Sequence, residues 1–148
     1  MIPAPILVIG YGNTLRRDDG AGPRVAEAIG RLGLPDVQTL ILHQLSPEHA
    51  DPISRAGTVI FVDAALGGPD TIQIRPVAPS DTHRLEGHTA DPAILLALAR
   101  DIFGHAPVAW LVTLPIRSMD FGEHLDPVTE ARVPKAVTQV LGLLKIGD

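Results

Sequence analysis

The chain has 148 residues, enough to bury the core of one domain spanning residues 1–148. It contains no cysteine, which excludes disulfides, thiolate metal sites and cysteine nucleophiles. Its net charge of −5, with basic residues scattered apart from the Arg16–Arg17 pair, argues against a nucleic-acid partner.

Apolar, β-branched runs predict the strands of this protein. The first run follows MIPAP directly, without a basic region or cleavage site, so we expect no export signal. Every apolar run is shorter than the roughly 20 residues that a membrane-spanning helix needs. We therefore expect a cytoplasmic protein without membrane insertion. The expected strands are residues 5–10, 37–42, 58–63, 71–77 and 107–114.

Two segments between these runs have clear helical patterns. In GPRVAEAIGRLG, Pro23 suits a first turn and Gly33 can end the helix in a left-handed conformation. In DPAILLALARDIFG, Asp91 is a candidate N-cap and Pro92 takes the first helical position. The apolar stripe of this second helix consists of Ile94, Leu95, Leu98 and Ile102, ahead of Gly104.

Two further helices are expected. SPEHADPISRA can form a short one. In the last helix, Pro134 marks either the start or a kink. The apolar side of that helix consists of Val133, Val137, Val140, Leu141 and Leu144.

Strands that alternate with helices predict an α/β fold, a three-layer α/β/α sandwich around a twisted, mostly parallel five-stranded sheet. The connection AALGGPD is too short for a parallel crossover, so the strand at 71–77 is expected to run antiparallel.

Carboxylates are predicted at the carboxyl edge of this sheet, where ligands of such folds bind. Gly10 and Gly12 begin a glycine loop, but Leu15 stands where a dinucleotide fingerprint needs its third glycine. Asp18 and Asp19 would repel a pyrophosphate and favour a cation. Asp63 closes the buried run TVIFVD, so its carboxylate must be hydrogen-bonded, paired or bound.

His88, in LEGHTADP, can join these acids as a third ligand. Two carboxylates and an imidazole suit a divalent transition metal with open positions. The alternatives are structural: Asp18 or Asp19 caps the next helix, Asp63 belongs to a polar network, and His88 is an ordinary loop residue. Serine hydrolysis is disfavoured because no Gly-x-Ser-x-Gly motif is present.

The chain resembles the hydrogenase maturation endopeptidases, which trim the C-terminal extension from the large subunit of nickel–iron hydrogenase. The matching stretches are GYGNTLRRDDGAG, VIFVDA, GHTADP and LPIRSMDFGEHLDPVTEARVPKAV. The resemblance implies a mixed sheet between helices and a nickel-linked site. It assigns the metal-binding and catalytic positions to Asp19, Asp63 and His88, and the loop glycine and asparagine to Gly12 and Asn13. One departure is LHQLSPEHA, where many members carry a DGGT-like turn.

This resemblance predicts an endopeptidase that acts as a monomer on the nickel–iron hydrogenase large-subunit precursor after nickel insertion, with nickel supplied by that precursor. The alternative is a nickel-binding accessory protein for hydrogenase assembly that does not cut. The loop IRSMDFGEHLDP, with Phe121, is a candidate substrate contact or a self-packed loop.

Overall fold

The computed structural model describes residues 3–82, 90–117, 120 and 122–145. Over these residues the strands are β1 (Ile6–Tyr11), β2 (Val37–Leu42), β3 (Thr58–Leu66), β4 (Gln73–Pro76) and β5 (Val108–Ile116). The helices are α1 (Ala21–Arg31), α2 (Ala50–Ser54), α3 (Pro92–Phe103) and α4 (Pro127–Leu144), with 3₁₀ turns η1 (Arg17–Gly20) and η2 (Pro47–His49).

The five strands of the described chain form one sheet in the order β2-β1-β3-β5-β4. β1 pairs in parallel with β2 and β3, and β3 pairs in parallel with β5. β4 pairs antiparallel with β5, which confirms the prediction from its short connection to β3. The fold is the predicted mixed α/β sandwich.

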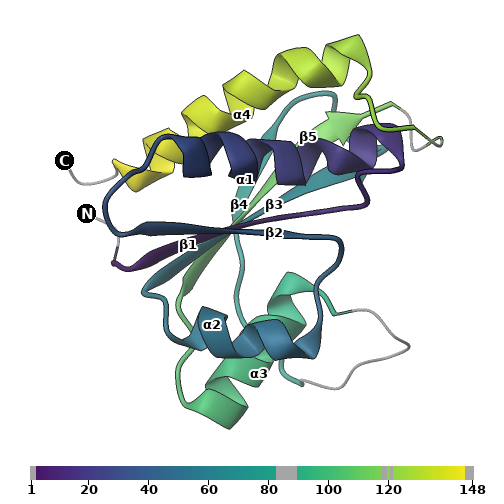
Figure 1. Cartoon of the computed structure of the whole chain (residues 1–148). Helices are drawn as coiled ribbons and strands as arrows, with labels where there is room; N and C mark the ends of the chain where they lie inside the picture. The colour runs from purple at the N-terminus through teal and green to yellow at the C-terminus, as the bar shows by residue number, and fades with distance from the viewer. Residues whose placement is uncertain (1–2, 83–89, 118–119, 121, 146–148) are drawn as a thin grey trace.

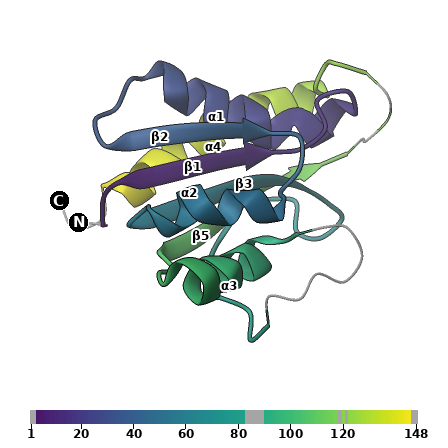
Figure 2. The same cartoon turned by 60° about the horizontal axis from the view of Figure 1, so that its bottom comes forward.

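Helices cover both faces of the sheet (Figure 1). α1 and α4 lie on one face, and α2 and α3 lie on the other, as the turned view also shows (Figure 2). Each interface has its own apolar cluster, one around Val8, Ile60 and Val112, the other around Ile9 and Phe61. Because successive side chains of a strand point to opposite faces, the runs that are covered on both faces, Ile6–Ile9 and Val59–Val62, are apolar throughout.

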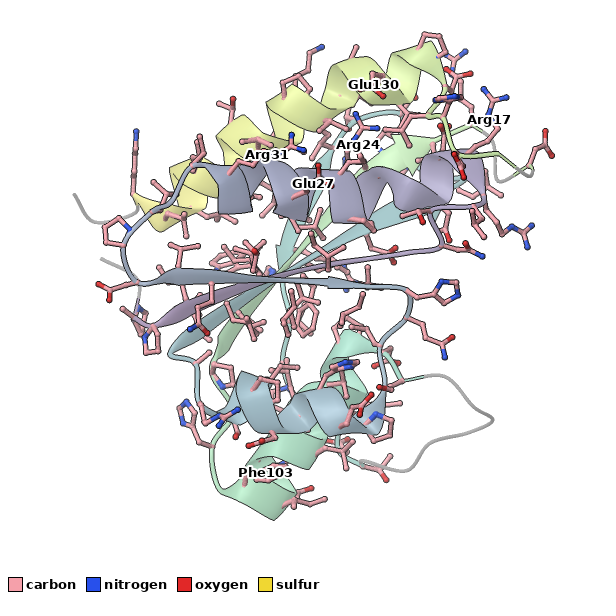
Figure 3. All side chains as sticks on the ribbon, in the orientation of Figure 1. Arg17, Arg24, Glu27, Arg31, Phe103 and Glu130 are labelled. Carbon is pink, nitrogen blue, oxygen red and sulfur yellow. The ribbon has the colours of Figure 1, made fainter. Side chains whose placement is uncertain are left out.

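The predicted helix signals of α3 are confirmed at both ends. The Asp91 side chain accepts a hydrogen bond from Ile94 N at 2.9 Å, and Gly104 has a left-handed φ of 82°. The predicted stripe is wrong at Ile102, which is 62% exposed. The last turn of α3 points away from the sheet, as the position of Phe103 in Figure 3 shows.

The last helix begins earlier than Pro134, which lies inside it. The start is set by Asp126, whose side chain accepts a hydrogen bond from Val128 N, with Pro127 in the first turn. α4 is tied to α1 by the Arg24–Glu130 ion pair, 2.6 Å between Nη2 and Oε1 (Figure 3). Over the described residues, no helix combines the length and the apolar character needed to span a bilayer.

Candidate functional site

The candidate site is the gap at the carboxyl edge of the sheet where β1 and β3 stop pairing, which we call the crevice. Their last register pair is Gly10 with Val62. Beyond it β1 stays with β2, and Gly12 N donates to Leu42 O at 3.0 Å. β3 stays with β5 as far as Leu66. Since β1 leads through α1 to β2 on one side of this gap, and β3 leads through β4 and α3 to β5 on the other side, the gap is a topological switch point, the usual ligand position in open α/β sheets.

The glycine loop after β1 presents Asp19 at this crevice. Asn13 N donates to Asp19 Oδ2 at 2.7 Å, and Asn13 Oδ1 accepts from Leu15 N at 2.9 Å. Gly12 has a φ of +150°, and a Cβ added there would lie 1.9 Å from Asp19 O. The loop therefore needs a glycine at this position for Asp19 to approach, and the main chain fixes one oxygen of its carboxylate.

Asp63 lies at the end of the pairing between β1 and β3 and is half-buried. Ala64 N donates to its Oδ1 at 2.8 Å. The pKa of Asp63 is raised to about 6, chiefly by burial and in smaller part by the negative charge of Asp19, while hydrogen bonds from Ala64 N–H and the Tyr11 hydroxyl act in the opposite direction. Asp19 and Asp63 are therefore close enough to interact, and each has one oxygen held by a main-chain N–H.

Tyr11 is a residue of this site that the sequence analysis did not single out. It packs against the cluster on the α2/α3 face, and its hydroxyl donates to the Asp63 carboxylate. Burial raises the pKa of Tyr11 well above its ordinary value, and the charge of Asp63 adds to the shift. Its position in the sequence was the available signal. Tyr11 follows the first apolar run and Asp63 ends another, and the ends of neighbouring parallel strands lie at the same edge of a sheet.

Asp18 is fully buried and faces away from the crevice into the β5–α4 connection. Its Oδ1 accepts from Asp126 N at 2.6 Å, and its Oδ2 accepts from Arg117 N at 3.1 Å and Thr129 Oγ1 at 2.8 Å. The capping interpretation is wrong for both acids, since the N-cap of α1 is Gly20. Asp18 instead tethers η1 to the start of α4.

A second tether joins the same two segments through Arg17, which Figure 3 shows at the carboxyl end of the strands. Arg17 N donates to Gly122 O, and Gly122 N donates to Leu15 O, both at 2.8 Å. Arg17 has a φ of +42°, and its Cγ would lie 3.1 Å from a Cβ added to Gly122. The late segment thus holds the loop that carries Asp19.

The third predicted ligand, His88, lies outside the described residues, as does Phe121. Over the residues that are described, no three histidine or acidic side chains gather as metal ligands. The structure brings together two of the three predicted positions, Asp19 and Asp63. Carboxylate oxygens with free lone pairs suit a divalent cation, so this pair is compatible with part of a metal site.

The fold and the crevice can now be compared with known proteins. No protein-family model and no curated protein matches the chain. Among solved structures, it is similar to the hydrogenase maturating endopeptidase HybD from E. coli, with 26% identity, a TM-score of 0.75, and coverage of 95% of this chain and 91% of that one.

A second similar structure is the hydrogenase 2 maturation peptidase from Thaumarchaeota archaeon SCGC_AB-539-E09, with 25% identity, a TM-score of 0.69, and coverage of 95% of this chain and 98% of that one. The [NiFe] hydrogenase maturation protease HycI from Thermococcus kodakarensis KOD1 shares the fold, with 23% identity, a TM-score of 0.72, and coverage of 97% and 94%. The resemblance inferred from the sequence is thus confirmed at the level of structure, and these neighbours support a protease role.

Proposed function

We propose that this chain, whose fold is that of hydrogenase maturation endopeptidases, removes the C-terminal extension of a nickel–iron hydrogenase large-subunit precursor after nickel insertion. The observation that carries the proposal is the pair of carboxylates, Asp19 and Asp63, at the switch-point crevice of this fold. A protein that only binds its partner also needs a binding site. Two interacting carboxylates in a partly buried site are, in contrast, typical of an enzyme active site.

In this proposal nickel arrives with the precursor, and Asp19, Asp63 and His88 supply ligands to it. A metal held there polarises a peptide carbonyl or lowers the pKa of a bound water. The three residues lie far apart in the sequence and include no thiolate, so the free protein is expected to hold divalent metal weakly. The precursor's own ligands would complete the coordination, which links cutting to metal insertion.

The chain's residues prepare this site before the substrate arrives. Asn13 N–H holds one oxygen of Asp19, while Ala64 N–H and the Tyr11 hydroxyl hold the Asp63 carboxylate. Within the described part of the chain, the remaining lone pairs of both acids are open to a ligand. Such fixed orientation lowers the entropy lost when a ligand is positioned for reaction.

The test is to incubate the protein with a nickel-loaded large-subunit precursor and to measure the intact mass of the precursor. The proposal expects loss of one fixed C-terminal fragment, abolished by Asp19→Asn and Asp63→Asn. Asp51→Asn is the matched control because Asp51 lies on α2 in an exposed pair with Arg55. Binding of the precursor with no change in its mass would instead support the accessory protein that does not cut.

A further inference from the structure

Over the described residues, the edge of β3 that lines the crevice has no strand beside it. β1 pairs with β3 only as far as Val62, whereas β5 pairs with β3 as far as Leu66. Asp63–Leu66 therefore extends beyond its neighbour on one side. Within the described part of the chain, no strand pairs with this four-residue extension on the β1 side.

The main-chain groups of Ala64 and Leu66 point to that open side. Backbone groups of a strand alternate between its two neighbours. Val62 O faces the seam with β1, where it would lie 2.4 Å from a Cβ added to Gly22 and close to Tyr11 O. Two residues later, Ala64 N bonds to Asp63 Oδ1 rather than to β5. By the same alternation, Leu66 N–H and both carbonyls face the crevice.

We propose that this edge, Asp63–Leu66, binds an extended, non-acidic segment of the polypeptide substrate by adding it as a strand beside β3. The inference rests on the proposed function and specifies how the precursor is held. The Ala64 carbonyl and the N–H and carbonyl of Leu66 form a row of main-chain groups that another extended main chain can match and that few other ligands can. Asp19 and Asp63 at the same crevice disfavour an acidic segment.

Strand addition would hold the precursor mainly through its main chain. Main-chain hydrogen bonds give affinity without reading sequence, and side-chain pockets give selectivity. Leu66, 62% exposed at the end of the extension, offers an apolar surface to one substrate side chain. A segment paired with Ala64 and Leu66 would carry its peptide bonds past the Asp63 carboxylate.

Two variants of Leu66 separate the contribution of its main-chain N–H from that of its side chain. Leu66→Pro removes the N–H, which is not part of the ladder with β5, so the strand should tolerate it. Leu66→Ala keeps the N–H and removes the apolar side chain. We expect the KM for nickel-loaded precursor to be about fivefold higher for Leu66→Pro than for Leu66→Ala, with similar kcat, because one substrate hydrogen bond is lost. Equal KM values in two folded variants would overturn the proposal.

Amide hydrogen exchange tests the edge without any substitution in it. The precursor should slow exchange of the Leu66 amide about tenfold or more in wild-type protein, or in Asp19→Asn protein if cutting is too fast. The mature subunit, which lacks the extension, should not slow exchange of this amide. The control amides are those of Gln73 and Ile74 on β4, which is an edge strand of the sheet. If Leu66 is protected and wild-type protein leaves the precursor mass unchanged, the edge proposal stands and the proteolytic function fails. Unchanged Leu66 exchange in both proteins overturns the edge proposal, whatever the mass shows.

Discussion

The carboxylate of Asp18 accepts a hydrogen bond from the Thr129 hydroxyl at 2.8 Å, across 111 residues of sequence. Both groups are fully buried. The neighbouring Asp19 turns the other way, toward Asn13 and the crevice. Two adjacent acids of identical chemistry therefore have different surroundings: Asp18 holds the loop to α4, and Asp19 lies at the proposed substrate site.

Asp18→Asn is expected to lower the free energy of unfolding by about 1–3 kcal/mol, because an amide N–H₂ would face donors that now bond to a carboxylate. Urea unfolding measures this, with the surface variant Asp51→Asn as the control. At temperatures where it stays folded, Asp18→Asn should process precursor better than Asp19→Asn. A stability equal to wild type would show that the buried tether is dispensable.

Asp63→Asn is expected to abolish processing and yet to stabilise the fold at pH 8. The pKa of Asp63 is raised from 3.8 to about 6 in the folded protein, so the folded state holds the proton more tightly than the unfolded chain. The stability that comes from this tighter proton binding is fully present below pH 4 and is lost as pH rises through 6. The free energy of unfolding of the variant should exceed that of wild type by about 1–3 kcal/mol at pH 8 and should equal it at pH 4. Chemical unfolding at the two pH values checks this, and a gain that did not depend on pH would contradict it.

Gly22→Ala is expected to destabilise the protein by about 2–4 kcal/mol. A Cβ at this position would lie 2.4 Å from Val62 O and 2.7 Å from Tyr11 O, both of them backbone atoms. Gly142→Ala is the matched control, because it is also helical and has no atom within 4 Å of its added Cβ. That variant should be neutral or more stable by about 0.5–1 kcal/mol. Thermal unfolding compares the two, and equal effects would refute the close packing of α1 on the seam.

His88→Ala is expected to abolish processing with little change in melting temperature, since a residue whose predicted role is to bind metal shapes a site more than it fills a core. The precursor mass and the melting temperature are measured on the same protein preparation. Full processing by the variant would show that His88 is not essential for processing.

Processing is expected to require nickel in the precursor. Enzyme treated with a chelator and then freed of it should cut nickel-loaded precursor and leave metal-free precursor intact. Metal analysis of both proteins accompanies the mass measurement. Rapid cutting of metal-free precursor by metal-free enzyme would point to Asp19 and Asp63 as a metal-independent carboxylate pair.

Much of the fold follows from local features of the sequence. The Asp91-Pro92 start and the Gly104 end of α3 depend on capping and on a left-handed backbone, which act within a few residues. The antiparallel β4 follows from a connection too short to cross the sheet. Asp63 was identifiable because a carboxylate at the end of a buried apolar run needs a partner.

Other features were decided only by contacts between distant segments. Local sequence could not assign different tasks to Asp18 and Asp19, because the donors that bury Asp18 belong to Arg117, Asp126 and Thr129. The partnership of Tyr11 with Asp63 depends on β1 and β3 lying side by side. The open edge at Leu66 exists because one neighbour of β3 ends before the other, a difference in pairing length that the sequence of a single strand does not encode.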